Sequence, residues 1–171
     1  VNLMGIGTTW TNADLLRIGA GGPGVVNVNT DAVLTNNGET RINDQGELSI
    51  AGGSFDANGD VYVTGGQLER TFGTFNLLSG SMLRVEDAGE VDLASFYSSG
   101  HTIEVDGAGS RLDVTAQLRV GGTAPSTLDV TFGGEVDAAV VLIAVGSGAG
   151  GSSVAVDGDD STATANTTYV G

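Results

Sequence analysis

The chain carries a short alternating pattern of apolar and polar residues that recurs along its whole length. Each copy has two apolar residues flanking a single residue, and successive copies begin 22 to 28 residues apart. In six of the seven copies the middle residue is polar. Alternation with a period of two is typical of a strand that has one face in the core and the other in water. The apolar pairs are Val1/Leu3, Val26/Val28, Leu48/Ile50, Phe75/Leu77, Ile103/Val105, Leu128/Val130 and Val154/Val156.

A longer repetition accompanies these triplets. Leu16-Arg17 recurs 102 residues later as Leu118-Arg119, and Val105-Asp106-Gly107 recurs 51 residues later as Val156-Asp157-Gly158. We interpret the chain as coils of about 25 residues, of two alternating kinds, paired into a repeat of about 51 residues.

These repeats predict an all-β fold, a right-handed parallel β-helix (β-solenoid) of about seven coils. No segment has a convincing helical period, and the Gly spacing would interrupt any long helix. Three short strands per coil bury a face only when equivalent strands of successive coils stack. Residues 1–171 are therefore expected to form a single solenoid segment, cut from a longer array. We expect the first apolar residues of the seven triplets to stack in one column along the solenoid axis. These residues are Val1, Val26, Leu48, Phe75, Ile103, Leu128 and Val154.

Two stretches interrupt the pattern, and we expect them to be inserted loops that lengthen their coils. They are Gly65 to Thr74 and Ser95 to Thr102. Projecting loops on a solenoid are natural places for binding, although a lid over the side of the core is the simpler and favoured explanation. The candidate binding residues in or beside these loops are Phe72, Phe96, Tyr97 and His101.

Composition narrows the classes of protein further. Gly accounts for 29 of the 171 residues and Pro for only 2, while 40% of the residues are hydrophobic, which excludes both collagen and a disordered linker. No apolar run is long enough for a transmembrane segment, and the absence of Cys excludes disulfides. With 21 acidic and 6 basic residues the net charge is −15, which argues against nucleic acid or an anionic membrane as a partner.

The acidic residues make calcium the one cofactor to consider. Two corners place oxygen-bearing side chains close together, as calcium ligands are, but the first lacks the spacing of an EF-hand or RTX calcium loop. Ordinary turns explain the same residues, and solvation relieves their repulsion. Separately, Glu104 and Asp129 are expected to be neighbours on successive coils. The candidate Ca²⁺ ligands are Asp56, Asn58 and Asp60 at one corner and Asp157, Asp159 and Asp160 at the other.

Three phrases of the sequence resemble a known class of repeat. Gly5-Ile6-Gly7-Thr8-Thr9-Trp10-Thr11-Asn12, then Leu16-Arg17-Ile18-Gly19, and later Thr127-Leu128-Asp129-Val130-Thr131-Phe132-Gly133-Gly134 are similar to the repeats of secreted bacterial autotransporter-type and PEP-CTERM-associated β-helix proteins. These are scaffold motifs without catalytic residues. The resemblance implies an extracellular or cell-surface location and a structural role such as a stalk, passenger or matrix fibre.

Catalysis has little support in the sequence. There is no Lys, His101 is the only His, and Arg17 and Arg119 occupy repeat positions that suggest scaffold contacts. We therefore expect a non-catalytic structural segment that self-associates through its terminal coils, with filaments as one outcome. The alternative is a passenger-type adhesin that binds glycans or a host surface through the two inserted loops.

Overall fold

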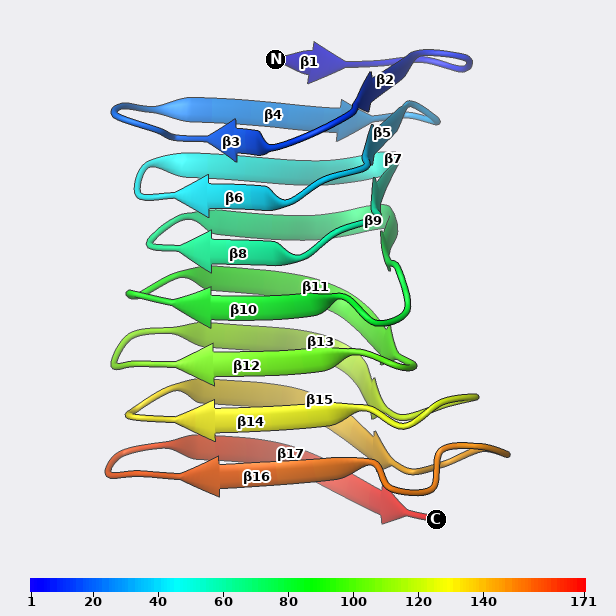
Figure 1. Cartoon of the computed structure of the whole chain (residues 1–171), viewed down its shortest axis with the longest axis vertical. Helices are drawn as coiled ribbons and strands as arrows, with labels where there is room; N and C mark the ends of the chain where they lie inside the picture. The colour runs from blue at the N-terminus through cyan, green and yellow to red at the C-terminus, as the bar shows by residue number, and fades with distance from the viewer.

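The computed structural model describes all 171 residues, and its regular structure consists of strands alone. The strands form three faces (Figure 1). We number them first, second and third in the order in which the chain passes through them in each coil. The third face is one parallel sheet of β3 (Leu16–Ile18), β6 (Thr40–Asn43), β8 (Val61–Thr64), β10 (Met82–Glu86), β12 (Thr102–Asp106), β14 (Thr127–Thr131) and β16 (Ser153–Asp157).

The first and second faces share long strands that bend at the corner between them. The first face begins with β1 (Asn2–Leu3) and β4 (Gly24–Asn29), and the second with β2 (Thr9–Asn12) and β5 (Val33–Asn36). The later strands run through both faces: β7 (Gly46–Ala57), β9 (Gln67–Leu77), β11 (Glu90–Ser98), β13 (Arg111–Val120), β15 (Glu135–Ile143) and β17 (Thr162–Val170).

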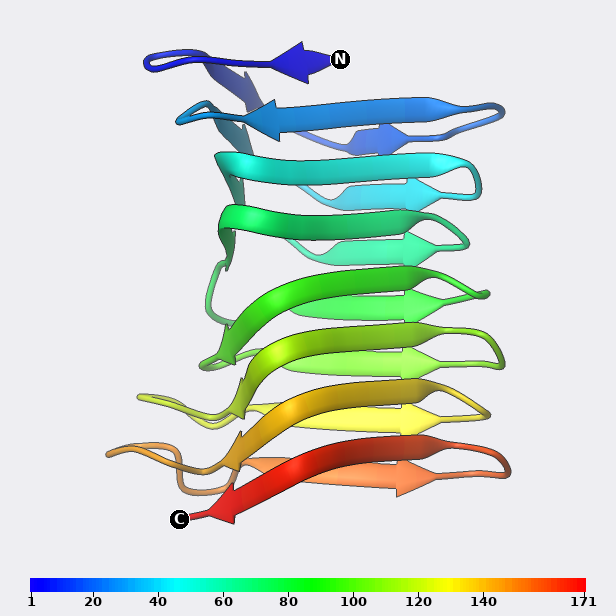
Figure 2. The ribbon, with the colours of Figure 1, turned by 180° about the vertical axis from the view of Figure 1, so that it is seen from behind.

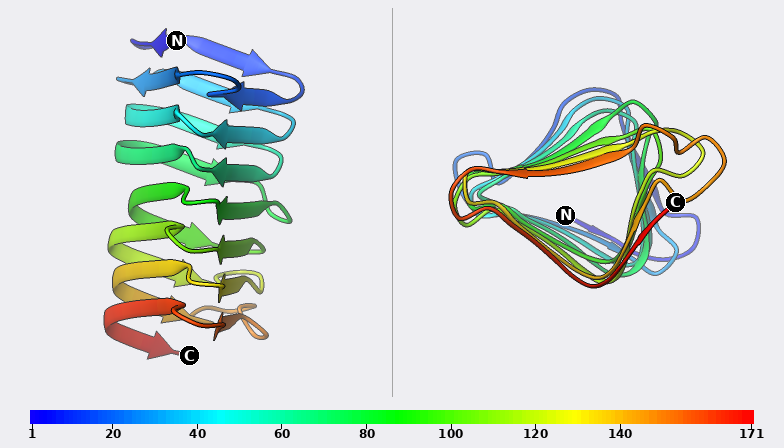
Figure 3. Two further views of the ribbon diagram at one scale, coloured as in Figure 1. Left: turned by 90° about the vertical axis from the view of Figure 1, so that its left-hand side faces the viewer. Right: turned by 90° about the horizontal axis from the view of Figure 1, so that it is seen from below.

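The chain winds as a right-handed coil with a three-sided cross-section (Figure 3). In Figure 1 the near strands, β3 to β16, run to the left, the far strands run to the right, and the coils descend from the N-terminus to the C-terminus. Every ladder between consecutive coils is parallel. The predicted β-solenoid is therefore confirmed. No helix is present that has the length and hydropathy to cross a bilayer.

The inward residues of the three faces form one continuous core of 30 buried residues. On the first face the core column runs Val26, Leu48, Leu68, Val91, Leu112 and Val136 in register from β4 to β15. On the second face Phe55 stacks on Phe75 and Phe75 on Phe96, with ring centroids 5.6 and 5.7 Å apart. Burying a Leu or Phe side chain in this way stabilises the fold by about 1.5–3 kcal/mol.

The predicted single column is wrong, because the seven triplets lie on all three faces. Those at Val26 and Leu48 are on the first face, the one at Phe75 is on the second, and those at Ile103 and Leu128 are on the third. The middle coils are shorter than 25 residues, since Leu48 pairs with Leu68, 20 residues on. Phe75 lies a further seven residues along the chain, which is one face round the coil.

The two copies of the longer sequence repeat also lie on different faces. Leu16-Arg17 belongs to β3 on the third face, whereas Leu118-Arg119 lies in the second-face half of β13. The two alternating kinds of coil are therefore not found. Val105 and Val156 do lie on one column, two coils apart, with Val130 between them.

Glycine lines the corner between the third and first faces because a side chain there would collide with the coil before it. A Cβ atom added to Gly46, Gly66, Gly89 or Gly134 would lie only 2.2 to 2.5 Å from a backbone oxygen of the preceding coil. At the equivalent position before Arg111, the buried Ser110 accepts a hydrogen bond from the Ala88 N–H instead.

The expected insertions are also wrong, because the extra residues lie at other corners. Residues 65–74 belong to β9 and the turn before it, and residues 95–102 to β11, the turn after it and the first residue of β12. Leu83 and Ile103, which flank the second stretch, are paired at a separation of only 20 residues. The projecting loops are residues 121–126 and 144–152, between the second and third faces of the C-terminal coils (Figure 1).

Candidate functional site

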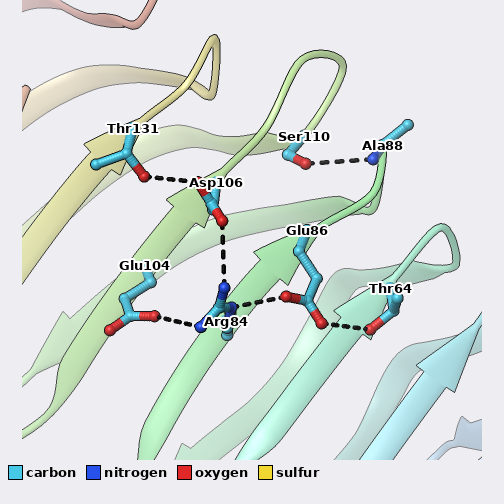
Figure 4. Close-up of polar contacts among 8 residues, drawn as sticks. All are labelled: Thr64, Arg84, Glu86, Ala88, Glu104, Asp106, Ser110 and Thr131. Atoms are coloured by element: carbon cyan, nitrogen blue, oxygen red, sulfur yellow. Dashed lines mark hydrogen bonds and ion pairs between the residues drawn. The ribbon is translucent and has the colours of Figure 1, made fainter. Parts of the chain in front are cut away.

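The third face carries a cluster of charges around Arg84 (Figure 4). The Arg84 guanidinium lies 2.7 Å from Glu86 on its own strand and 3.2 Å from both Glu104 and Asp106 on β12. The cluster extends to both neighbouring strands, because Thr64 Oγ1 donates to Glu86 at 3.2 Å and Thr131 Oγ1 donates to Asp106 at 2.7 Å. These contacts link β8, β10, β12 and β14 on the outer surface.

Electrostatics around Arg84 favour its charged form. Burial by itself lowers the pKa of Arg84, but the carboxylates of Glu86, Glu104 and Asp106 raise it overall. Three carboxylates around one guanidinium leave the cluster with an excess of negative charge. Glu104 and Asp129 are register partners on β12 and β14, as the sequence predicted.

The first face carries a column of carboxylates on four successive strands. Glu69, Asp92, Asp113 and Asp137 pair in register from β9 to β15. Their partners are polar or basic: Gln67 Nε2 donates to Asp92 at 3.3 Å, and Arg111 lies 3.0 Å from Asp113 in its own strand. No three carboxylate or imidazole groups converge closely enough to hold a metal ion, in this column or elsewhere.

The three side chains of the first predicted calcium corner each interact with a different residue of a neighbouring coil. Asp56 accepts a hydrogen bond from Asn76 at 2.7 Å, and Asp60 accepts one from the backbone N–H of Met82 at 2.9 Å, both one coil further on. Asn58 donates to Asn37 of the preceding coil at 2.8 Å. The three side chains therefore point to three places and bridge neighbouring coils.

The second corner is an exposed turn after β16. Asp157 accepts a hydrogen bond from the Gly158 N–H at 2.8 Å, and Asp160 has a positive φ of 62°. Asp157, Asp159 and Asp160 are all exposed. Calcium at either corner stays a prediction, and the hydrogen bonds present are those of turns and ladders.

The four predicted binding residues do not form one surface. Phe96 is only 3% exposed, inside the aromatic stack, and His101 is 6% exposed at the corner before the third face. Phe72 and Tyr97 are 72% and 61% exposed. The expectation that Phe96 and His101 lie on open loops is wrong, because Phe96 is an inward residue of β11 and His101 is buried in the short turn before β12.

His101 sits in a closed environment. Burial lowers its pKa, while the nearby backbone groups of Leu78 and Ser81 act in the opposite direction and to a smaller extent. Its Nδ1 atom is buried and has no hydrogen-bond partner. Its neutral form is therefore the one that fits the folded protein.

The second face contains a break in its ladder that the sequence did not predict. β9 pairs with β7 over Thr74–Leu77, and β11 pairs with β13 over Ser95–Ser98. β9 and β11, however, pair only over their first-face halves, Gln67–Arg70 with Glu90–Leu93. We call the space between Thr74–Leu77 and Ser95–Ser98 the slot.

A cavity of about 250 Å³ opens in the slot, and its walls are the two unpaired strand segments. Arg70 lies at one end and donates to the backbone oxygens of Gly73 and Ser95, so it spans the two sides. Burial lowers the pKa of Arg70, against a smaller raising effect of Tyr97, and no carboxylate pairs with it. The lining residues are Arg70, Thr74, Phe75, Asn76, Leu77, Ser95, Phe96 and Tyr97.

A change of corner causes the break. Four residues lie between the paired Arg70 on the first face and the core residue Phe75 on the second, but only two lie between Leu93 and Phe96. The second halves of β11, β13, β15 and β17 consequently slope toward the C-terminal end, whereas β4, β7 and β9 stay level up to their corner (Figure 2). A sequence signal exists in hindsight, because Gly73 at this corner gives way to Ala94 in the next coil.

Comparisons with protein-family models, with curated proteins and with solved structures found no match to this chain. Its function is therefore argued from its own geometry.

Proposed function

We propose that this chain is a structural segment of an extracellular or cell-surface bacterial protein, and that it acts by extending as a stiff solenoid. The observation that carries the proposal is the continuous core, in which the same inward positions stack from β4 to β15 under unbroken first-face and third-face ladders. A stack of this kind grows along one axis by repetition, and each coil contacts only its neighbours. The likeness to autotransporter-type and PEP-CTERM-associated repeats supports the same location.

The outer surface is consistent with a solvated spacer. Its faces carry carboxylate columns, the Arg84 cluster and ladders of Thr, Ser and Asn, such as Thr74 donating to Ser54 at 2.7 Å. Charged outward rows discourage sideways association between sheets. Two of the four residues of the adhesin alternative are buried, and no contact on the surface favours that alternative.

The proposed partner is a second copy, joined through the terminal coils. At the C-terminal end the core-facing residues of β16 and β17 line an apolar hollow of about 360 Å³. Val156 is 46% exposed there and Val170 is 75% exposed. At the other end Val1 is 66% exposed and Trp10 is only partly buried. Stacking the two ends would bury apolar surface and pair the open edges of the outermost strands.

Substitution of Val156 tests this partner. We expect Val156→Asp to abolish concentration-dependent association in sedimentation velocity, because a carboxylate in the hollow would be buried without a counter-charge. Ala155→Asp is the matched control, since it puts the same charge on the same strand but outward. Circular dichroism of both variants checks the fold.

Two results would count against the proposal in different ways. A wild-type chain that stays monomeric at high concentration would remove self-association and leave the spacer. A chain that is flexible in small-angle scattering, with no rod-like cross-section, would remove the spacer itself.

A further inference from the structure

The slot exposes backbone hydrogen-bonding groups on both of its sides. In a parallel sheet, alternate residues direct their N–H and C=O groups to opposite neighbours. The Leu78 N–H donates to Ala57 of the preceding coil, so Phe75 and Leu77 direct their backbone groups into the slot. The Gly121 N–H donates to Ser98 from the following coil, so Ser95 and Tyr97 direct theirs into the slot from the other side.

These groups form two parallel-strand edges that face each other, and part of each is already satisfied. Arg70 occupies the carbonyl groups of Gly73 and Ser95 at one end. The backbone groups of Phe75, Leu77 and Tyr97 have no ladder partner on the slot side. Unpaired edges are templates for another strand, because the main chain of an extended peptide offers donors and acceptors at the same spacing.

The floor of the slot determines which strand would fit. The rings of Phe75 and Phe96 lie 5.7 Å apart with an interplanar angle of 10°, so they close the core beneath the opening. A strand lying above them has room on its inward side only for a small side chain. On its outward side it meets Thr74, Asn76, Ser95 and Tyr97, which are polar or amphipathic.

We propose that the slot binds an extended peptide segment of another polypeptide, which adds one strand between β9 and β11. The segment pairs with Phe75 and Leu77 on one side and with Tyr97 on the other, and it presents Gly, Ala, Ser or Thr to the aromatic floor. The occupant is a peptide because both walls present unpaired backbone donors and acceptors. Arg70 sets one end of the bound segment. The slot is distinct from the terminal coils and does not depend on self-association.

A synthetic peptide with a fluorescent label tests the proposal on the intact chain. The probe is the nonapeptide TATANTTYV, the sequence of β17, three of whose core-facing residues, Ala163, Ala165 and Thr168, are small. The control is the same peptide N-methylated at the positions of Thr167 and Thr168, which removes a donor from each edge. We expect fluorescence anisotropy to show binding of the probe and at least about tenfold weaker binding of the control, since two ladder hydrogen bonds are lost.

Hydrogen exchange locates the site. The amides of Phe75, Leu77 and Tyr97 should exchange rapidly in the free protein and become protected when the probe is added, while the core amides stay unchanged. Protection at the terminal strands instead would show that the probe merely extends the stack, and would overturn the proposal.

A backbone substitution gives a second, independent readout. Tyr97→Pro removes a slot-facing N–H that has no partner in the free protein, so the fold should persist as it does for Pro at a sheet edge. We expect the variant to bind the probe at least about tenfold more weakly. Equal binding by this variant, equal binding of the N-methylated peptide, or protection of the same amides by a neutral oligosaccharide but not by the probe would each contradict a peptide strand in the slot.

Discussion

At the scale of single residues, steric limits decide where glycine is required. Many glycines in the chain have a positive φ, but the φ of Gly89 is not positive. Glycine is still required there, because an added Cβ would lie 2.2 Å from the Val63 carbonyl oxygen. Gly22, in the turn between β3 and β4, has only open space where an added Cβ would lie. The two residues therefore separate steric need from mere abundance of glycine.

Replacing each of these glycines with alanine tests that distinction. Gly89→Ala should lower the free energy of unfolding by about 1–3 kcal/mol, the usual cost of forcing an extra carbon into a packed site. Gly22→Ala should change it by less than about 0.5 kcal/mol. Urea unfolding measures both, and equal effects of the two substitutions would show that the corner does not pack as described.

His101 makes stability depend on pH in a specific direction. Burial lowers the pKa of His101 in the folded chain below its usual value of 6.5, so the unfolded chain binds the proton more readily. The stabilisation is therefore complete above pH 6.5 and is lost as the pH falls toward the folded-state pKa.

A non-titrating variant isolates this effect. Between pH 7.5 and pH 5, the urea midpoint of the wild-type chain should fall more than that of His101→Gln, because the carboxylates are common to both and their contributions cancel. Parallel pH profiles for the two proteins would mean that His101 titrates normally in the folded state.

At the scale of elements, outward charges add links between strands whose register the core already fixes. Arg84 on β10 faces carboxylates on its own strand and on β12, with Glu104 and Asp106 both 3.2 Å away. Without this cation, Glu86, Glu104 and Asp106 would stand as like charges on neighbouring strands, which destabilises a ladder.

Salt tests the role of Arg84. Arg84→Gln should lower the free energy of unfolding by about 1 kcal/mol at low ionic strength, the scale of a partly exposed charge network. The loss should shrink in about 1 M NaCl, because salt screens the remaining carboxylates. Arg17→Gln is the control, since Arg17 makes no ion pair. A loss that is the same at both salt concentrations would indicate a packing effect of the side chain.

The elements also show how far the sequence pattern reaches. Period-two alternation correctly identifies inward residues such as Leu48, Ile103 and Leu128, because burial on one face of a strand depends only on local alternation. It does not identify which face a strand belongs to, because that depends on the summed lengths of strands and corners. Phe75 matches the pattern and still lies one face away from Leu48.

The candidate site was harder to predict for the same reason. The sequence brings Glu104 and Asp129 together correctly, since their coil contains no slip between them. It places Phe96 and His101 on loops because their stretch breaks the triplet spacing, although the coil there is simply short. The slot depends on a two-residue difference between successive corners, which a single repeat interval averages out.

At the scale of the whole molecule, the coil changes character along its axis. Corners between the first and second faces shorten from five residues, between Val28 and Leu34, to two, between Leu93 and Phe96. Corners between the second and third faces lengthen from three residues, between Ala57 and Val61, to ten, between Ile143 and Val154. The number of residues at each corner therefore changes along the axis, and the length of the coil changes with it, while the three faces are retained.

Cross-linking tests the central claim, that the chain is a three-faced solenoid with the register described, most directly. The chain contains no Cys, so each pair of introduced Cys residues is read without background. Ser49 and Glu69 are outward register partners on β7 and β9, within reach of a disulfide. Asn76 lies instead on the second face, beside Asp56. Ser49→Cys with Glu69→Cys should form a disulfide under mild oxidation, as measured by mass spectrometry of a digest, while Ser49→Cys with Asn76→Cys should remain reduced. A disulfide in the second pair and none in the first would contradict the register and restore a single column of triplets.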